Sequence, residues 1–265
     1  MTAPAGTGPR RGWAWHWPGL LLAALLALSP APAPAPAQTA DRIVRFTAED
    51  WPPFTGPGEP GDSIFLDIVT RALALRGYGV EVTLLPWKRA IEVAQADPSY
   101  VGVLPVYLED LRNIPGFFAS VPVMTSPLGL AERADNPVRW NVIADLAHYR
   151  LGTVLGYANT AEFDDAVATG KLDVEPAPTD AVNLERLAAG RIDAAVVDAN
   201  AFEYLLEHEA SLRAVGATLR FNGHVLAKQP VSVAFRQNAL GRAIAAELAA
   251  GLKSLDPESL PALAH

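Results

Sequence analysis

The first half of the chain alternates strand-like and helix-like patterns of apolar and polar positions. Residues 43–47 alternate as a half-buried strand does, and residues 87–96 carry apolar positions at helical spacing. Asp67 is expected to cap the first helix and Gly77 to end it. These patterns predict a β-α-β-α-β unit with strands at 43–47, 80–85 and 100–106 and helices at 67–76 and 87–96.

The second half repeats this order. A helix is expected to begin at Asn159 or Thr160, and a second helix is expected to be capped by Asp180 and ended by Gly190. The predicted strands lie at 150–155, 172–175 and 192–197, with helices at 181–189 and up to His208. Connecting strands are expected at 128–131 and 231–235, before a last helix at 239–255. Two such units predict an α/β protein of two lobes with a ligand cleft between them.

Asp198 lies at the most informative position in this pattern. Four apolar residues at 194–197 predict a parallel strand that is buried on both faces. Asp198 follows where this strand leaves the sheet, and ligands bind at that edge of open α/β sheets. Its carboxylate could hold a cationic group, or Asp198 or Asn200 could simply cap the helix that follows. The local pattern leaves both interpretations open.

The N-terminal segment has the features of a secretory signal. Arg10 and Arg11 precede nine apolar residues at 20–28, fewer than the roughly 20 that span a bilayer. Ala-Pro-Ala at 35–37 is a typical cleavage sequence. We therefore expect a signal peptide at 1–37, cleavage after Ala37 and a periplasmic protein. The paired arginines leave the export route open, and an uncleaved membrane anchor is the alternative.

Composition narrows the possible functions. Removing the signal leaves 19 basic and 29 acidic residues, a net charge of −10, which disfavours nucleic acid and anionic membranes as partners. The chain has no cysteine, which excludes thiolate catalysis. The mature histidines show no metal-ligand spacing, so neither a metal nor a cofactor is expected.

Five short motifs follow one another along the chain. They are Trp-Pro-Pro-Phe at 51–54, Phe-Leu-Asp-Ile at 65–68, Glu-Asp-Leu-Arg at 109–112 with Phe-Phe-Ala-Ser-Val-Pro at 117–122, the strand and glycine turn at 151–157, and Gly-Arg-Ile-Asp-Ala at 190–194 continuing to Asp198. Each motif is weak alone, but in this order they resemble the family 3 extracellular solute-binding proteins, which deliver polar amino acids and related solutes to ABC importers. The resemblance covers nearly all of the expected mature chain.

The resemblance implies the type II periplasmic binding protein fold, in which two βαβ-type lobes are joined by two hinge strands. It implies a first lobe at 38–127 plus 229–265 and a second lobe at 128–228. The expected protein is a monomer that captures a small polar solute, an amino acid or a related zwitterion or carboxylate. Its expected partners are that solute and the membrane subunits of an importer.

The resemblance also implies binding roles for individual residues. Arg112 matches the arginine that clamps the ligand carboxylate, and Asp198 matches the residue that takes the ammonium group. Asn159 and Thr160 lie at a helix N-terminus that attracts a carboxylate. The remaining candidates are aromatic and could stack on the ligand or pack in the core: Trp51, Phe54, Trp87, Tyr107 and Tyr157.

The chain departs from the family pattern at 104–107, Leu-Pro-Val-Tyr, where amino-acid receptors carry small hydroxyl residues. Pro105 removes a donor and Glu109 replaces the usual threonine, which puts an α-amino acid as the ligand in doubt. Binding without catalysis is expected. One alternative is a cyclohexadienyl dehydratase-like enzyme that uses Glu109 or Asp110 for acid–base work. The other is a stand-alone sensing partner of a membrane receptor.

Overall fold

Ten strands form one mixed sheet in the computed structural model, which describes residues 42–57 and 63–256. The expected signal peptide lies outside these residues. The main path of the sheet runs β2-β1-β3-β10-β5-β8-β6-β7, with β4 paired to β10 and β9 paired to β5. The strands are β1 Arg42–Ala48, β2 Tyr78–Leu84, β3 Tyr100–Tyr107, β4 Phe117–Ala119, β5 Met124–Arg133, β6 Leu151–Val154, β7 Val174–Ala177, β8 Ala194–Asp198, β9 Leu219–Phe221 and β10 Ala227–Arg236.

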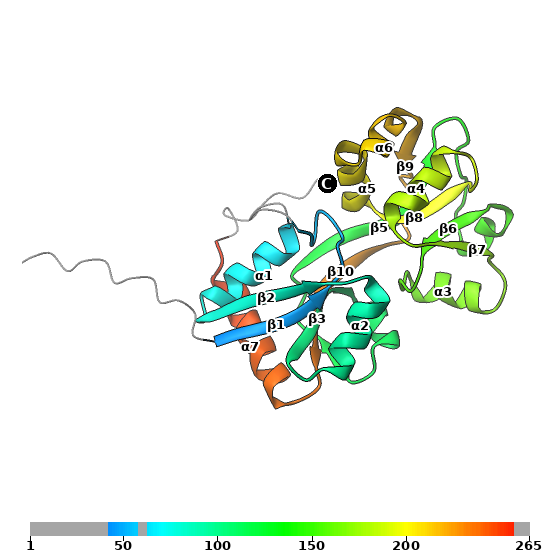
Figure 1. Ribbon diagram of the computed structural model, residues 1–265. Helices are drawn as coiled ribbons and strands as arrows, with labels where there is room; N and C mark the ends of the chain where they lie inside the picture. The colour runs from blue at the N-terminus through cyan, green and yellow to red at the C-terminus, as the bar shows by residue number, and fades with distance from the viewer. Residues whose placement is uncertain (1–41, 58–62, 257–265) are drawn as a thin grey trace, which may run out of the picture. The chain divides into compact units, whose positions relative to one another are not determined.

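Two groups of parallel strands make the two lobes. In the first lobe β1 pairs in parallel with β2 and β3, and in the second lobe β6 pairs in parallel with β7 and β8. The antiparallel strands β5 and β10 pair with each other and run from one group to the other (Figure 1). They contain the predicted connecting strands 128–131 and 231–235. The exact lobe boundaries stay a prediction.

The helices cover the faces of the two strand groups. Helices α1, α2 and α7 lie with the first lobe and α3 to α6 with the second (Figure 1). Their bounds are α1 Ile64–Ala74, α2 Trp87–Ala96, α3 Ala161–Ala168, α4 Asp180–Ala188, α5 Ala199–His208, α6 Ala210–Arg213 and α7 Ala239–Ser254. Three short 3₁₀ helices are η1 Leu108–Asn113, η2 Ile143–His148 and η3 Gly216–Thr218.

Two predicted helix caps are wrong by a few residues. Helix α1 begins at Ile64, so Asp67 lies within its first turn instead of capping it. Helix α4 is capped by Thr179, whose hydroxyl accepts a hydrogen bond from the Val182 amide, and Asp180 is its first residue. In both cases an acidic side chain near the helix start was mistaken for the cap, because acids are favoured at both positions. The strand expected at 172–175 is β7, which lies two residues later.

The core of the first lobe is built from aromatic side chains on β1, α1 and β10. Phe46, Phe65 and Phe235 are completely buried, and the rings of Phe46 and Phe235 meet edge to face at 5.7 Å. Helix α7 returns the end of the chain to this lobe and packs on α1. A Cβ at Gly251 would collide with the backbone carbonyl of Ala72, so glycine sets this close approach.

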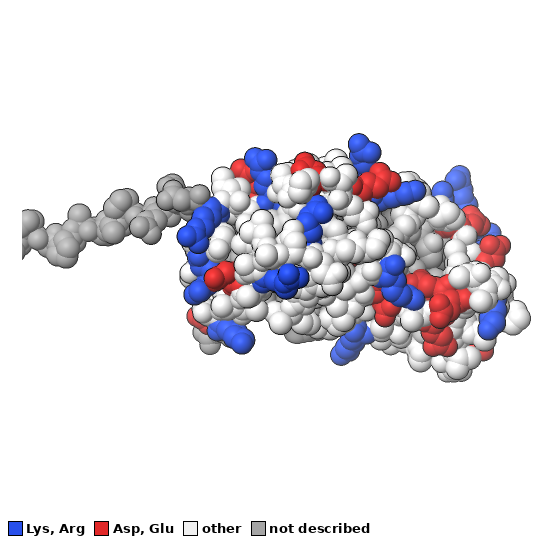
Figure 2. All heavy atoms as spheres, turned by 90° about the horizontal axis from the view of Figure 1, so that it is seen from below, with Lys and Arg blue, Asp and Glu red and all other residues white. Residues whose placement is uncertain are grey.

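Charged side chains cover the surface unevenly. On the face shown in Figure 2, acidic side chains gather in the part where α3 lies in Figure 1. Helix α3 carries acids in its first turn, where the helix dipole favours them: Glu162 and Asp164. Among the described residues, no helix is both long and apolar enough to cross a membrane.

Candidate functional site

Acidic and aromatic side chains gather where strands of both lobes end. In the first lobe, Glu49 and Trp51 follow β1, and Tyr107 is the last residue of β3. In the second lobe, Tyr157 follows β6 and Asp198 ends β8. These positions are the carboxyl ends of parallel strands, where α/β sheets bind ligands. Asp180 joins them as the first residue of α4.

Aromatic rings from both lobes meet at this edge. The ring of Trp51 lies 5.6 Å from that of Tyr107 and 6.2 Å from that of Tyr157. The rings of Trp87 and Tyr157 lie 6.4 Å apart and are nearly perpendicular to each other. Phe54 packs on Trp51 at 4.3 Å and is completely buried, so it supports the cluster from the core side.

Two small cavities adjoin this aromatic cluster and share four lining residues. The Glu49 cavity is also lined by Asp110 and Trp87, and the Asp198 cavity is also lined by Asp180 and Asn159. The shared residues are Trp51, Tyr107, Tyr157 and Ala158. The volume that the centre of a water molecule can occupy is about 20 Å³ in the Glu49 cavity and about 10 Å³ in the Asp198 cavity. Each cavity therefore has room for about one water molecule.

Asp198 caps a helix, as one of its two predicted roles requires, and it also lines a cavity, while binding of a cationic group stays a prediction. Its Oδ1 accepts hydrogen bonds from the backbone amides of Asn200 and Ala201, at 2.8 and 3.4 Å, and so caps α5. Its Oδ2 accepts a 2.7 Å hydrogen bond from the hydroxyl of Tyr107 across the two lobes. The carboxyl group is almost completely buried, and burial raises its pKa.

Two further acids are less fully bonded. Burial raises the pKa of Asp180 to about 7. The Trp51 indole donates a 3.0 Å hydrogen bond to its Oδ2, and this hydrogen bond lowers the pKa but does not cancel the effect of burial. Burial also raises the pKa of Glu49 to about 8, against the lowering effect of the hydrogen bond that the Tyr157 hydroxyl donates. The charge of Asp180 raises the pKa of Glu49 further, so the two carboxyl groups interact.

The carboxylate of Asp110 accepts hydrogen bonds from backbone amides of both lobes. Its Oδ2 accepts a 2.8 Å hydrogen bond from the Tyr107 amide, and its Oδ1 accepts one of 3.2 Å from the Ala158 amide. It is buried, and burial raises its pKa to about 7 in spite of these two donors. Both carboxylate oxygens therefore have partners before any ligand arrives.

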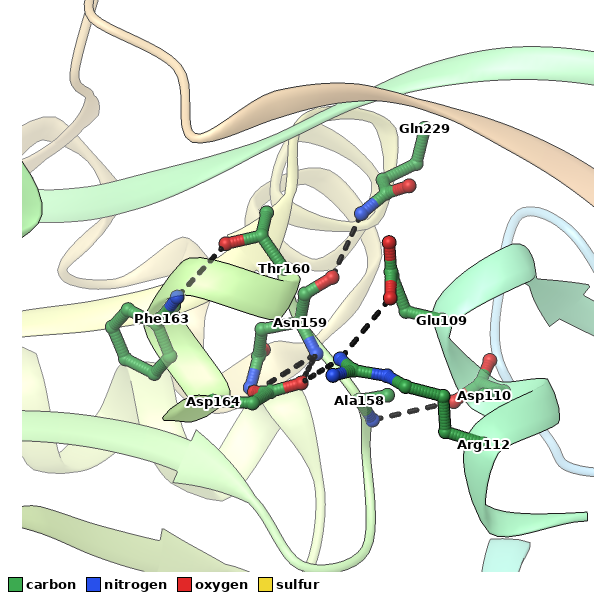
Figure 3. A network of polar contacts seen from close by, with 9 residues as sticks. All are labelled: Glu109, Asp110, Arg112, Ala158, Asn159, Thr160, Phe163, Asp164 and Gln229. Carbon is green, nitrogen blue, oxygen red and sulfur yellow. Dashed lines mark hydrogen bonds and ion pairs between the residues drawn. The ribbon is translucent and has the colours of Figure 1, made fainter. Parts of the chain in front are cut away.

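Arg112 lies outside both cavities, in a network that Figure 3 shows. Its guanidinium contacts the carboxylates of Asp164 at 3.0 Å and Glu109 at 3.1 Å. It lines a separate, more open groove with Tyr157 and Asn159, in which the centre of a water molecule has about 390 Å³. The described structure thus places Arg112 and Asp198 in different hollows of the molecule.

The other predicted site residues divide between the cavities and the fold. Trp51, Trp87, Tyr107, Tyr157 and Asn159 line one or both cavities. Thr160 caps α3, as its hydroxyl accepts a hydrogen bond from the Phe163 amide, and Phe54 lies in the core. Their ligand contacts remain predictions.

Sequence reasoning missed Glu49 and Asp180 as site residues. Glu49 follows β1 directly, and the same carboxyl-end argument that selected Asp198 would have selected it. Asp180 was interpreted only as a helix cap. Neither cavity is lined by Lys, Arg or His among its described residues. The described residues also contain no group of three or more His, Asp or Glu side chains placed to hold one metal ion.

Comparison with known proteins gives similarity in structure only. No family model matches the sequence, and no curated protein sequence matches it. A histidine kinase sensor domain with similarity to periplasmic binding proteins superposes with a TM-score of 0.68 at 20% identity, covering 81% of this chain and 90% of that one.

Two further solved structures are similar. An ancestral arginine-binding protein bound to arginine gives a TM-score of 0.64 at 17% identity, with 80% of this chain and 91% of that chain covered. The substrate binding protein of an amino acid ABC transporter gives 0.62 at 17% identity, covering 80% and 92%. At these identities the comparisons establish the fold, and the predicted α/β, two-lobed type II periplasmic binding protein fold is confirmed.

Proposed function

We propose that this protein is a periplasmic solute-binding protein that captures a small organic cation between its lobes and delivers it to an ABC importer. The observation that carries the proposal is the lining of the two cavities. Glu49, Asp110, Asp180 and Asp198 face the same aromatic cluster, and no described basic side chain lines either cavity. Buried carboxylates without cationic partners are costly, and a bound cation would neutralise them.

The aromatic rings fit the same ligand. Tryptophan and tyrosine faces attract cations, and desolvated contacts of this kind contribute about 2 kcal/mol. Arginine is the ligand of one solved structure with this fold, which supports a cationic group in the ligand of this protein. The cavities hold about one water each in this conformation, so ligand entry requires the lobes to separate first.

The first experiment is thermal unfolding of the purified protein with arginine, lysine, amines, quaternary ammonium compounds, neutral amino acids and dicarboxylates. A cation at 100 times its Kd should add about 2.7 kcal/mol of stability, whereas dicarboxylates should add none. Asp180→Asn should weaken this effect, because it removes a buried negative charge while keeping the shape. Stabilisation by dicarboxylates alone would refute the proposal.

The role in transport needs a separate test. A sensor remains the second candidate, since a histidine kinase sensor domain is among the similar structures. In cells that lack the protein, uptake of the labelled cation should fall if it serves an importer. Unchanged uptake together with an altered transcriptional response to the cation would favour the sensor instead.

The location and the lack of catalysis belong to the same proposal. N-terminal sequencing of the exported protein should begin at Gln38, as expected for cleavage after Ala37. We propose binding without chemistry, and this is supported by Asp110, one of the two candidate acids, whose carboxylate oxygens each already accept a backbone hydrogen bond. Product formation from prephenate would contradict this and favour the dehydratase-like alternative.

A further inference from the structure

The groups that would receive a ligand carboxylate are already bound to the protein's own acids. The amides of Ala158 and Asn159 lie just before α3, where a helix N-terminus attracts anions. The Ala158 amide donates to Asp110 at 3.2 Å, and the Asn159 amide donates to Asp164 at 3.1 Å (Figure 3).

Arg112, the arginine predicted to clamp a ligand carboxylate, is occupied in the same way. The guanidinium of Arg112 lies between Asp164 and Glu109, at 3.0 and 3.1 Å. A ligand carboxylate would have to displace one of these acids and leave it without its partner, which costs free energy even at a partly exposed site. The described linings of the two cavities therefore offer a carboxylate no cationic side chain, and the unpaired indole nitrogen of Trp87 in the Glu49 cavity is only a neutral donor.

The acids that line the cavities differ in their remaining capacity. Both oxygens of Asp110 and both oxygens of Asp198 accept hydrogen bonds from the protein. Glu49 receives one side-chain hydrogen bond, from Tyr157, and Asp180 receives one, from Trp51. An ionised carboxylate can accept about four, so Glu49 and Asp180 have the most capacity for a ligand.

These two acids line different cavities, and the two cavities share aromatic lining residues. Glu49 belongs to the first cavity and Asp180 to the second, with Trp51, Tyr107 and Tyr157 lining both. An aliphatic chain that packs between the aromatic rings could reach from Glu49 to Asp180. Such a chain would place no polar group against the rings.

We propose that the ligand is an aliphatic dication without a carboxylate, a diamine or a guanidino-amine, with one cationic end against Glu49 and the other against Asp180. This inference rests on the proposed function and narrows its ligand class. It is independent of whether an importer or a receptor accepts the loaded protein.

The test compares each cationic amino acid with its decarboxylated counterpart by calorimetric titration of the purified protein. The pairs are lysine with cadaverine, ornithine with putrescine and arginine with agmatine. At least one diamine or guanidino-amine should bind ten or more times tighter than its amino acid. Equal or tighter binding of all the amino acids would overturn the inference but leave the proposed function standing, whereas no binding by any cation would remove both.

The two-ended contact is tested with a ligand that has one charge. Pentylamine should bind ten or more times more weakly than cadaverine, and equal binding would overturn the second contact. Glu49→Gln and Asp180→Asn should each weaken cadaverine binding at least tenfold, whereas Glu109→Gln, a control outside both cavities, should change it less than twofold. Unchanged cadaverine binding in both cavity variants, with folding verified by circular dichroism, would overturn the assignment of the ends.

Discussion

Asp198 shows how one side chain can hold an element and shape a cavity at the same time. Asp198→Ala removes the cap of α5, which typically costs about 1 kcal/mol, and leaves the buried Tyr107 hydroxyl without its acceptor, which costs about 1–3 kcal/mol more. We therefore expect a loss of about 2–4 kcal/mol in the free energy of unfolding, measured by urea titration.

Asp198→Asn is the matched control, because asparagine caps helices as well as aspartate and introduces no buried charge. It should cost less than the alanine variant at pH 7. Equal losses in the two variants would mean that the charge, not the hydrogen bonds, stabilises this corner.

Phe54 is the predicted ligand contact whose burial indicates a structural role. Its ring is completely buried against Trp51. Phe54→Ala should lower the free energy of unfolding by about 3–5 kcal/mol, as expected when a buried ring leaves a cavity. Urea unfolding measures this loss, and a loss below 1 kcal/mol would show that the ring is not packed as described.

At the scale of the elements, the contact between α1 and α7 depends on a missing side chain. Alanine at Gly251 would gain about 1 kcal/mol in helix propensity, but its Cβ would collide with the Ala72 carbonyl. A backbone carbonyl cannot relieve this clash by changing rotamer, as a side chain can. The cost of overpacking, about 1–3 kcal/mol or more, should therefore exceed the gain in helix propensity.

Gly251→Ala should therefore lower the midpoint of urea unfolding. Gly223→Ala serves as the control, because a Cβ there meets nothing within 4 Å. A stabilised Gly251→Ala variant would contradict the close approach of the two helices.

The sequence predicted the elements well where local signals coincide. Pro86 and the apolar stripe of α2 fixed its bounds, and glycines with positive φ ended helices at Gly77 and Gly190 as expected. Helix starts were less certain, since aspartate favours both the cap and the first turn. The short strands β4 and β9 were not predicted, because three residues carry too little pattern to distinguish a strand from a loop.

The site was harder to predict than the fold. The carboxyl-end rule selected Asp198, which does line a cavity, since the rule depends only on strand order. The contacts of Arg112 depend on Asp164, which lies 52 residues away in the other lobe, and no local pattern reports such a pairing. Sequence motifs indicate which residues reach the cleft, whereas the packing of both lobes decides which of them remain unpaired.

For the whole molecule, the acids of the cavities should determine how stability depends on pH. The pKa of Glu49 is raised to about 8 and those of Asp110 and Asp180 to about 7. Between pH 4 and these values the folded protein holds more protons than the unfolded chain. Its free energy of unfolding should therefore fall as pH rises from about 5 to 8.

On the acid side, Asp193 has the opposite effect, because its hydrogen bonds with Arg150 lower its pKa. Stability should therefore also fall below about pH 4, which puts the maximum at mildly acidic pH. Thermal unfolding at constant ionic strength measures this profile, and Glu49→Gln should flatten its alkaline side. A ligand-free protein that is most stable at pH 8 would contradict the raised pKa values.

The same protons link ligand capture to pH. A cation in the cavities favours the ionised carboxylates, so binding near pH 7 should release protons from Glu49, Asp110 and Asp180. Calorimetric titration in two buffers of different ionisation enthalpy measures the number released. We expect a net release at pH 7 that vanishes above about pH 9, where these groups are ionised before the ligand arrives. Proton uptake at pH 7, or release that persists unchanged at pH 9.5, would mean that the cation does not lie against these acids.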